Sequence, residues 1–272
     1  MKNLKEKVAL VTGGAGGIGF AISKALASEH CHLAIADIDQ PKLLWAKGQL
    51  TTYYSVTVST HCLNVADKDA MQNLAEEIIQ THKRIDILIN NAGVSVNGLF
   101  ENTSLEDFHW LININLWGTI YGCKFFLPYL RQREQAHIVN ILSDFAFLGF
   151  PGKAAYGASK AALLGFSNAL YTELYNSSIG LSIVFPGPVA TDLIKSGRSG
   201  TETQKQKEII FMEKNSLKAD ELASKVLWAI KKNKYRVRIG GIIYLLDYLI
   251  RLFPGLTHRI IAKMRHKVAF ID

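Results

Sequence analysis

Short apolar runs alternate with longer amphipathic stretches along most of the chain. The apolar runs cover residues 7–12, 32–37, 85–90, 137–142 and 181–185, with weaker candidates at 56–63 and 237–239. The stretches at 17–28, 68–82, 105–131 and 154–175 have the length and spacing of helices. Continuous apolar strands separated by helices predict βαβ units, and right-handed crossovers then give a doubly wound parallel sheet. We therefore expect a single-domain α/β fold with helices on both faces of the sheet.

The C-terminal end differs from the rest of the chain in charge. The formal net charge is +8, and residues 221–272 hold 11 Lys and Arg against 3 Asp and Glu, which leaves 20 of each sign before them. Residues 242–253 are strongly apolar, and residues 257–267 form a second, basic amphipathic stretch. Twelve residues are too few to span a bilayer, although a basic amphipathic hairpin can lie in its interface.

We therefore divide the single domain into two parts. Residues 1–240 are expected to carry the site, and residues 241–272 form a C-terminal amphipathic helical extension. Three interpretations of the extension stay open: peripheral membrane contact through residues 241–267, packing against a partner subunit, and cover for a substrate pocket. A solvated basic face is the simplest reading of its charge.

Composition excludes several classes of protein. With 49% hydrophobic and 20% charged residues, the chain is not disordered. Its three cysteines, Cys31, Cys62 and Cys123, show no C-x-x-C spacing, which indicates reduced thiols and no metal site. We see no signal peptide and no apolar run of 18 residues, so we expect a cytoplasmic protein, or one on a cytosolic membrane face. Nucleic acid is not an expected partner, because no recognised binding module accompanies the basic charge.

A glycine-rich turn lies directly between the first strand and the first helix. Residues 12–19 read Thr-Gly-Gly-Ala-Gly-Gly-Ile-Gly. Glycines at this place let the backbone turn tightly and approach a pyrophosphate, whose charge the helix N-terminus would meet. The simpler alternative is a tight turn that needs positive φ angles. The candidate cofactor contacts in this turn are Gly13, Gly17, Ile18 and Gly19.

An acidic residue ends the second strand. Asp37 follows Gly19 by 18 residues, where a carboxylate can bond both ribose hydroxyls of a dinucleotide. The same carboxylate repels a 2′-phosphate, and neither Gly16 nor Ile38 supplies a basic charge that would attract one. The sequence therefore favours NAD over NADP as the cofactor.

Tyr156 and Lys160 are four residues apart in a predicted helix, so their side chains share one face. A nearby ammonium favours the phenolate and lowers the tyrosine pKa from about 10, which prepares a general acid or base. Ser143 follows the strand at 137–142, at the edge of the sheet where ligands bind. The alternative for Tyr-x-x-x-Lys alone is a surface pair.

Taken together, these motifs resemble the typical (short) branch of the short-chain dehydrogenase/reductase family. The shared features, in the family's order across residues 7–191, are Thr12-Gly-x-x-x-Gly-x-Gly19, Asn90-Asn-Ala-Gly93, Asn115, Ser143, Tyr156-x-x-x-Lys160 and Pro186-Gly187. The resemblance implies a Rossmann-like fold and an NAD(H)-dependent oxidoreductase that interconverts a secondary alcohol and a ketone. It also implies assembly into a homodimer or homotetramer through helices such as those at 105–131 and 154–175.

The resemblance assigns roles to four residues. Tyr156 would be the general acid/base at the substrate oxygen, and Ser143 would hydrogen-bond that oxygen. Lys160 would lower the Tyr156 pKa and bind the nicotinamide ribose. Asn115 would hold a water that passes protons to solvent; alternatively, it is a helix-interior Asn that bonds backbone.

The resemblance also extends the set of cofactor-binding residues. Asn91 and Gly93 would shape the wall beside the adenosine ribose. Where the family usually has Asp-Val after the third strand, this chain has Asn64-Val65, and an Asn oxygen can still accept the adenine amino group. The residues expected along the nicotinamide carboxamide are Pro186, Gly187, Val189 and Thr191.

A second departure follows the catalytic serine. Asp144 stands where small residues are usual, and its carboxylate would lie near the site mouth or point to water; we favour water. The loop then reads Phe145-Ala-Phe-Leu-Gly-Phe150. These rings, Phe145 and Phe150 above all, indicate an apolar substrate such as a steroid, lipid-derived or aromatic carbonyl. Packing against the core or a neighbouring subunit is the alternative.

Two other functions remain as hypotheses. The first is a non-catalytic nucleotide-binding scaffold that uses its basic C-terminus at membranes. Against it stands the complete set of Asn115, Ser143, Tyr156 and Lys160, part of which degenerate family members usually lose. The second is reduction of a carrier-bound acyl chain, because a basic patch could dock an acidic carrier.

Overall fold

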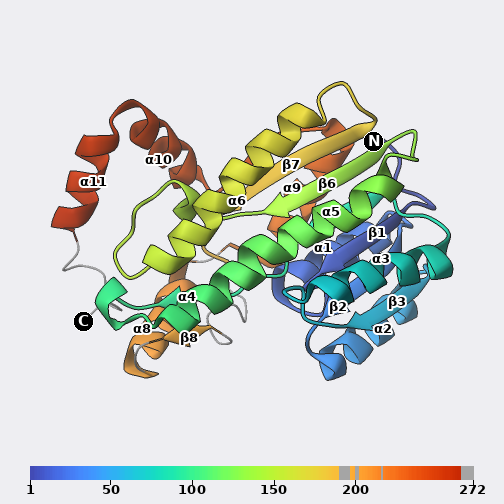
Figure 1. Ribbon diagram of the computed structural model, residues 1–272, viewed down its shortest axis with the longest axis horizontal. Helices are drawn as coiled ribbons and strands as arrows, with labels where there is room; N and C mark the ends of the chain where they lie inside the picture. The colour runs from blue at the N-terminus through green and yellow to red at the C-terminus, as the bar shows by residue number, and fades with distance from the viewer. Residues whose placement is uncertain (190–196, 200–201, 216, 265–272) are drawn as a thin grey trace.

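Seven parallel strands form one sheet in the order β3-β2-β1-β4-β6-β7-β9 (Figure 1). The computed structural model describes residues 1–189, 197–199, 202–215 and 217–264. All pairings in this sheet are parallel, which confirms the predicted doubly wound, Rossmann-like fold. The strands are β1 (Val8–Thr12), β2 (His32–Asp37), β3 (Val58–Cys62), β4 (Ile87–Asn90), β6 (Ala136–Ile141), β7 (Ile179–Pro186) and β9 (Arg236–Ile239).

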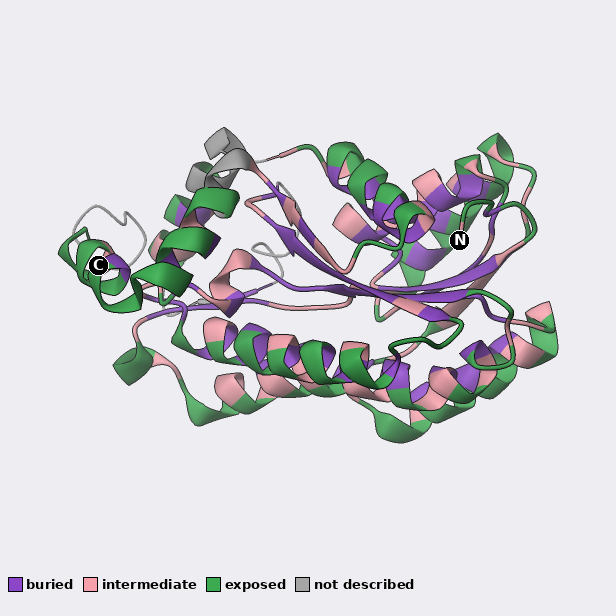
Figure 2. Ribbon diagram, turned by 90° about the horizontal axis from the view of Figure 1, so that it is seen from above, coloured by how far each residue is buried: buried purple, intermediate pink, exposed green. Residues whose placement is uncertain are grey.

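Helices cover both faces of the sheet, with their buried sides turned inwards (Figure 2). One face carries α1 (Gly17–Ser28), α2 (Gln40–Tyr53) and α9 (Ala219–Lys232), which share a hydrophobic cluster with the strands. The other face carries α3 (Lys68–His82), α5 (Gly118–Leu130) and α6 (Ala154–Glu173).

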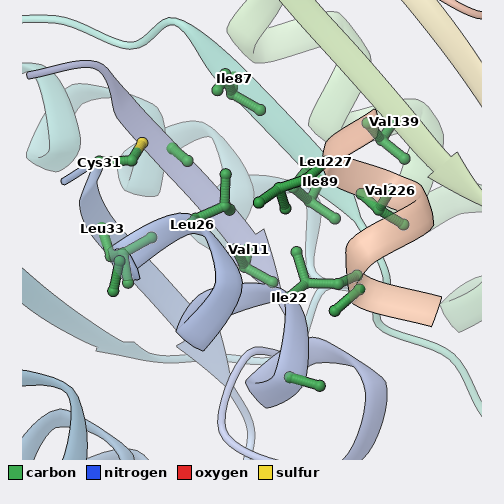
Figure 3. Close-up of a cluster of buried hydrophobic side chains, with 14 of the residues drawn as sticks. Val11, Ile22, Leu26, Cys31, Leu33, Ile87, Ile89, Val139, Val226 and Leu227 are labelled. Atoms are coloured by element: carbon green, nitrogen blue, oxygen red, sulfur yellow. The ribbon is translucent and has the colours of Figure 1, made fainter. Parts of the chain in front are cut away.

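Alternate strand residues serve the two faces, as the period of two in a strand requires. Val11 and Ile89 face the α1–α9 layer, whereas Leu10 and Leu88 face the opposite cluster. In the first cluster, Ile22 of α1 lies close to Val226 and Leu227 of α9. These three side chains pack against Val11 and Ile89 of the sheet (Figure 3). The sheet is therefore buried on both sides, and a ligand can reach it only at an edge or an end.

The stretch predicted as one helix at 105–131 is interrupted. It consists of α4 (Leu105–Ile112), a π-helical turn (Asn113–Trp117) and α5 (Gly118–Leu130). Hydrophobic spacing cannot reveal a single wide turn, because the apolar face continues across it. Such π-turns are frequent at functional sites, and this one contains the expected site residue Asn115.

Several small elements gather at the end of the sheet towards which the strands run (Figure 1). β5 (Val96–Asn97) pairs with β8 (Arg198–Ser199), and α8 (Glu202–Asn215) follows. Two short 3₁₀ turns, Phe100–Asn102 and Asp144–Ala146, complete this region.

The last described elements are α10 (Gly241–Leu252) and α11 (Pro254–Lys263), which stand out from the same end (Figure 1). Asp247 of α10 is fully buried and pairs with Arg236 and Arg238 of β9, as well as with Arg251. This cluster fastens the extension to the last strand. In the part of the chain that the structure describes, no helix is long and apolar enough to cross a membrane.

Candidate active site

The glycine turn after β1 closes tightly on itself and leaves one open face. Gly13 and Gly17 have φ angles of 62° and 52°, which favour glycine. A Cβ at Gly19 would collide with the carbonyl oxygen of Gly13. A Cβ at Gly16, by contrast, would meet nothing within 4 Å. The N-terminus of α1 therefore faces open space, and Gly16 caps it without a side chain, an arrangement that fits a pyrophosphate.

Asp37 lies beside this turn at the end of β2. Its carboxylate accepts hydrogen bonds from the backbone N–H groups of Ala15 and Asp39, both at 3.2 Å. The side chain thus joins the end of β2 to the glycine turn. This position fits the predicted role at a ribose, because a carboxylate keeps further lone pairs for hydroxyl groups.

The end of β4 is bound to the same turn through Thr12 and Asn91. The Asn91 side chain donates to the carbonyl oxygens of Thr12 and Gly13 at 3.0 and 3.1 Å. The Thr12 hydroxyl oxygen accepts the N–H groups of Asn91 and Ala92. These bonds hold the residues after β4 against the glycine turn after β1.

The four expected catalytic residues come together at the carboxyl ends of β4 and β6. Ser143 follows β6, Tyr156 and Lys160 lie on α6, and Asn115 lies in the π-turn; all four are buried. A Cβ built on Gly93 would lie 3.2 Å from Asn115 Oδ1 and 3.7 Å from Lys160 Nζ. Four residues that are distant in sequence therefore line one small region.

The Asn115 amide is used by the protein itself. Its Oδ1 accepts the N–H of Val94 at 2.8 Å, and its Nδ2 donates to the Val94 carbonyl and to Ser159 Oγ. This is the backbone-bonding alternative expected from the sequence. It is compatible with the water-holding role, which stays a prediction.

Burial controls the titration of the central pair. It lowers the pKa of Lys160 to about 8, and the Lys160 ammonium donates to the Ile141 carbonyl at 3.2 Å. Burial also raises the pKa of Tyr156, while its hydrogen bond with Ser143 lowers that pKa. The net direction for Tyr156 is opposite to the one expected from Tyr-x-x-x-Lys, because loss of hydration outweighs the other influences. A protonated phenol in this setting is suited to donate a proton.

Asp144 differs from the sequence expectation as well. We expected its carboxylate to point to water, but it turns towards the site. Its Oδ1 accepts the Ser143 hydroxyl at 3.0 Å and the Phe145 N–H at 3.0 Å. Burial raises the pKa of this carboxyl, against the effect of its hydrogen bonds with Ser143 and Phe145.

The phenylalanines of the loop divide into two groups. The Phe145 ring meets the Tyr156 ring edge-on at 5.9 Å between centroids, and Phe150 lies 5.5 Å from Phe145. Phe147 instead packs on Phe185 in the core. Two rings therefore form an apolar wall beside the phenol, and the third is structural.

One buried group was missed in the sequence. Lys153 Nζ, just before α6, lies 2.5 Å from Glu208 Oε1 of α8 and 3.3 Å from Ser95 Oγ. Both charged side chains are buried, and the Glu208 charge acts on Tyr156 to raise its pKa. No local sequence pattern distinguishes such a pair from surface residues.

The remaining cofactor candidates lie at the same sheet edge with differing exposure. Asn64 is exposed and its Oδ1 accepts the Ala66 N–H at 3.0 Å. Val65 packs against Gly118, and Ile18 packs on the core. Pro186 ends β7, followed by Gly187, whose N–H bonds Ile239, and by buried Val189, whereas Thr191 lies outside the described residues.

Comparison with known proteins defines the class. A family described as short chain dehydrogenase matches residues 7–202. A putative oxidoreductase, SadH, of Mycobacterium tuberculosis is 29% identical over 267 residues, which cover 96% of each chain. This chain belongs to the short-chain dehydrogenase/reductase family, and it is an oxidoreductase of that family.

Two solved structures show the same architecture with different dinucleotides. A short-chain dehydrogenase/reductase from Burkholderia phymatum in complex with NAD has a TM-score of 0.84 and 26% identity, covering 93% of this chain and 96% of its own. An alcohol dehydrogenase from Thermococcus sibiricus complexed with 5-hydroxy-NADP has a TM-score of 0.74 and 26% identity, covering 86% and 94%. The fold thus serves a nicotinamide cofactor, without deciding between the two forms.

Proposed function

We propose that this protein is an NAD(H)-dependent oxidoreductase that interconverts an apolar secondary alcohol and its ketone. The observation that carries the proposal is the proximity of Ser143, Tyr156 and Lys160 at the carboxyl ends of the central strands, beside the open glycine turn. The bound dinucleotide would supply the hydride, and the protein would orient it and handle the proton.

In this proposal Tyr156 donates a proton to the ketone oxygen, or removes one from the alcohol. Its raised pKa keeps the phenol protonated at neutral pH, which favours its action as the acid in reduction. Ser143 hydrogen-bonds the same oxygen as negative charge develops. Lys160 would bind the nicotinamide ribose, and Asn115 would hold the water that links Lys160 to solvent.

NAD is the proposed cofactor because Asp37 places a carboxylate at the end of β2, where a 2′-phosphate would meet its charge. The residues assigned to this cofactor are those of the glycine turn with Asp37, Asn64, Val65, Asn91, Gly93 and the segment after β7. Steady-state kcat/KM with NADH should exceed that with NADPH by at least tenfold. A preference for NADPH of that size would contradict the assignment.

The proposed substrate is apolar because the Phe145 ring contacts Tyr156 and the Phe150 ring contacts Phe145, which makes the surroundings of the phenol apolar. A panel of steroid, long-chain and aromatic ketones should be reduced, with NADH absorbance as the readout. Small polar ketones should react at least tenfold more slowly at equal concentration. Equal rates across the panel would remove the apolar assignment, and no turnover on any member would remove the enzyme function.

We also propose a homodimer or homotetramer formed through α4, α5 and α6. The rings of Trp117, at the end of the π-turn, and of Tyr121 and Phe125 on α5 form a row of aromatic contacts, in which Trp117 is 43% exposed. A face of this kind is suited to a partner subunit. Light scattering should give a multiple of the chain mass, and Trp117→Lys should lower it; a monomeric parent protein would refute the proposal.

The C-terminal extension is proposed to touch an anionic lipid surface, which would place a cytoplasmic enzyme at a membrane. Its exposed apolar side chains are Tyr244, Leu245, Tyr248, Leu249, Leu252, Phe253, Leu256, Ile260 and Met264. Arg251, Arg259 and Lys263 add exposed positive charge, whereas Asp247 is buried. Like charges of this sign disfavour self-association and favour anionic headgroups.

Vesicle flotation tests this surface directly. The full chain should float with vesicles rich in phosphatidylserine and stay behind with phosphatidylcholine alone. The double variant Leu252→Glu/Leu256→Glu should lose flotation, and Leu44→Glu, an exposed change on α2, should keep it. Flotation that is equal for the parent and the double variant would refute the surface.

A non-catalytic scaffold is the disfavoured alternative. Ser143, Tyr156 and Lys160 are buried together, and the burial of titratable groups costs stability that a scaffold without chemistry would have no reason to give up. The same turnover panel separates the two functions, because a scaffold would bind NADH without oxidising it.

A further inference from the structure

Asp144 holds the hydroxyl that the proposed reaction requires. A serine hydroxyl has one proton to donate and two lone pairs to accept with. In the structure that proton is directed to Asp144 Oδ1 at 3.0 Å, and the N–H of Phe145 donates to the same oxygen. While Ser143 donates to the carboxylate, it has no proton left for a ketone oxygen.

The backbone keeps this contact in place. Ser143 follows β6 in an extended conformation with φ −166° and caps the 3₁₀ turn that begins at Asp144. The Phe145 N–H also lies 3.3 Å from Ser143 Oγ, so one amide ties both side chains together. The turn packs closely on α6, which carries Tyr156. The backbone of the turn therefore holds the serine hydroxyl beside the Asp144 carboxyl group, and the contact does not depend on the rotation of a free surface side chain.

We propose that Asp144 is a positioning residue whose charge state decides the direction of the Ser143 hydroxyl. When ionised, Asp144 retains the serine proton, and Ser143 offers lone pairs to the substrate oxygen. When neutral, the Asp144 carboxyl donates its own proton to Ser143 Oγ, and the serine proton turns to the ketone. The inference rests on the proposed function, because it assumes that Ser143 contacts the substrate oxygen.

The ionised carboxylate has a second effect on the same site. Its charge raises the pKa of Tyr156, so it favours the protonated phenol and opposes the phenolate. Burial raises the pKa of Asp144 itself, which brings its titration closer to neutral pH. Among the described residues, four other titratable side chains lie on the elements around this turn: Tyr156 and Lys160 of α6, and the paired Lys153 and Glu208 just before α6 and on α8. His258 of α11 is a fifth, and its ring accepts a hydrogen bond from the Gly149 N–H.

The pH profile of the holoenzyme tests the proposal. In the parent protein, kcat/KM for ketone reduction should fall by about a hundredfold as Asp144 ionises, close to the loss of one oxyanion-stabilising donor. In Asp144→Asn the amide can donate to Ser143 at every pH, so this fall should vanish. In Ser143→Ala it should vanish as well, at a low activity throughout.

The reverse reaction should move in the opposite sense. Alcohol oxidation needs the phenolate, and removal of the Asp144 charge lowers the Tyr156 pKa. The acid limb of kcat/KM for oxidation should therefore move to lower pH in Asp144→Asn. A purely structural role would leave both limbs where they are. An Asp144→Asn profile that overlays that of the parent in both directions would overturn the proposal.

A measurement without turnover separates this inference from the proposed function. Carboxyl-carbon NMR of isotope-labelled aspartate, assigned with Asp144→Asn or, if that variant does not fold, Asp144→Ser, gives the Asp144 titration directly. The titration should lie above that of exposed aspartates and should rise further in Ser143→Ala, which removes a hydrogen bond to the ionised form. If Ser143→Ala leaves it unchanged, the inference fails even if turnover is found; if it rises while no ketone reacts, only the proposed function fails.

Discussion

Two clusters of buried titratable side chains, around Asp86 at the amino end of the sheet and around Lys160 at the carboxyl end, are neutralised very differently. At the amino end, Asp86 is fully buried beside β4 and contacts Arg84, Arg133 and Lys7, together with the N–H of Val8. At the carboxyl end, Lys160 and Tyr156 are buried with few polar partners, and burial shifts both pKa values towards the neutral form. The ion pairs around Asp86 stabilise the fold. The buried Lys160 and Tyr156 destabilise it, but their shifted pKa values suit proton transfer.

The largest expected effect is on the second end, in activity. Tyr156→Phe removes the proton donor and should lower kcat/KM by about 10²–10⁴-fold, which is about 3–5 kcal/mol of barrier. Thermal unfolding should occur at no lower temperature than in the parent protein. Tyr175→Phe, at an exposed tyrosine after α6, is the matched control and should keep full activity. Retained turnover in Tyr156→Phe would remove the functional side of the comparison.

A similar energy is expected at the first end, in stability. Asp86→Ala removes a fully buried carboxylate from three partly exposed cations and from the Val8 N–H, and should lower the free energy of unfolding by about 3 kcal/mol. Urea unfolding followed by circular dichroism measures this loss. Asp220→Asn, which breaks the exposed pair with Lys24, should cost about 0–1 kcal/mol. If the two substitutions cost the same, the amino-end cluster has no special role.

Lys160 gives the comparison a pH dependence. Its folded pKa is lowered from 10.5 to about 8, so between these values the unfolded chain binds more protons than the folded one. The free energy of unfolding therefore rises with pH across this window, by about 3 kcal/mol in total. Lys160→Met should lack this rise and be more stable than the parent at neutral pH, although inactive. The account would be contradicted if the free energy of unfolding, measured in urea from neutral pH upward, changed with pH in the same way in both proteins.

The smallest expected effect on stability comes from the glycine turn. Gly16→Ala adds a Cβ into open space and should change the free energy of unfolding by less than about 1 kcal/mol. It should nonetheless weaken NADH binding by about tenfold, because the methyl group occupies the face offered to the pyrophosphate. Fluorescence titration measures the affinity. Gly48→Ala, a change into open space on α2, is the control and should leave NADH binding unaltered.

Periodicity predicted the sheet because the central strands are largely apolar, as burial on both faces favours. The proximity of the proposed catalytic residues was also predictable, since Ser143, Tyr156 and Lys160 lie at fixed places relative to a strand and a helix. α2 was missed because its apolar residues are not confined to one face, and only Leu43, Ala46 and Leu50 are buried. α9 was missed although its apolar face is continuous, because the strand that follows it, at 237–239, was only a weak candidate in the sequence.

The rest depends on tertiary burial, which local patterns do not encode. The orientation of Asp144 follows from the turn that packs on α6, and nothing in its neighbours indicates it. The Lys153–Glu208 pair joins segments 55 residues apart. The direction of the Tyr156 pKa was wrong for the same reason, because helix spacing shows the nearby cation but not the loss of water around the phenol.

The most direct test of the central claim follows a label from cofactor to product. NADH deuterated at its transferable position is mixed with the enzyme and the best ketone of the panel, and the product is analysed by mass spectrometry. The account predicts one deuterium on the carbinol carbon with the parent protein, and formation of this labelled product at least about a hundredfold more slowly with Tyr156→Phe. Product without deuterium, or equal rates of labelling by both proteins, would contradict the claim that Tyr156 serves a hydride transfer at this sheet edge.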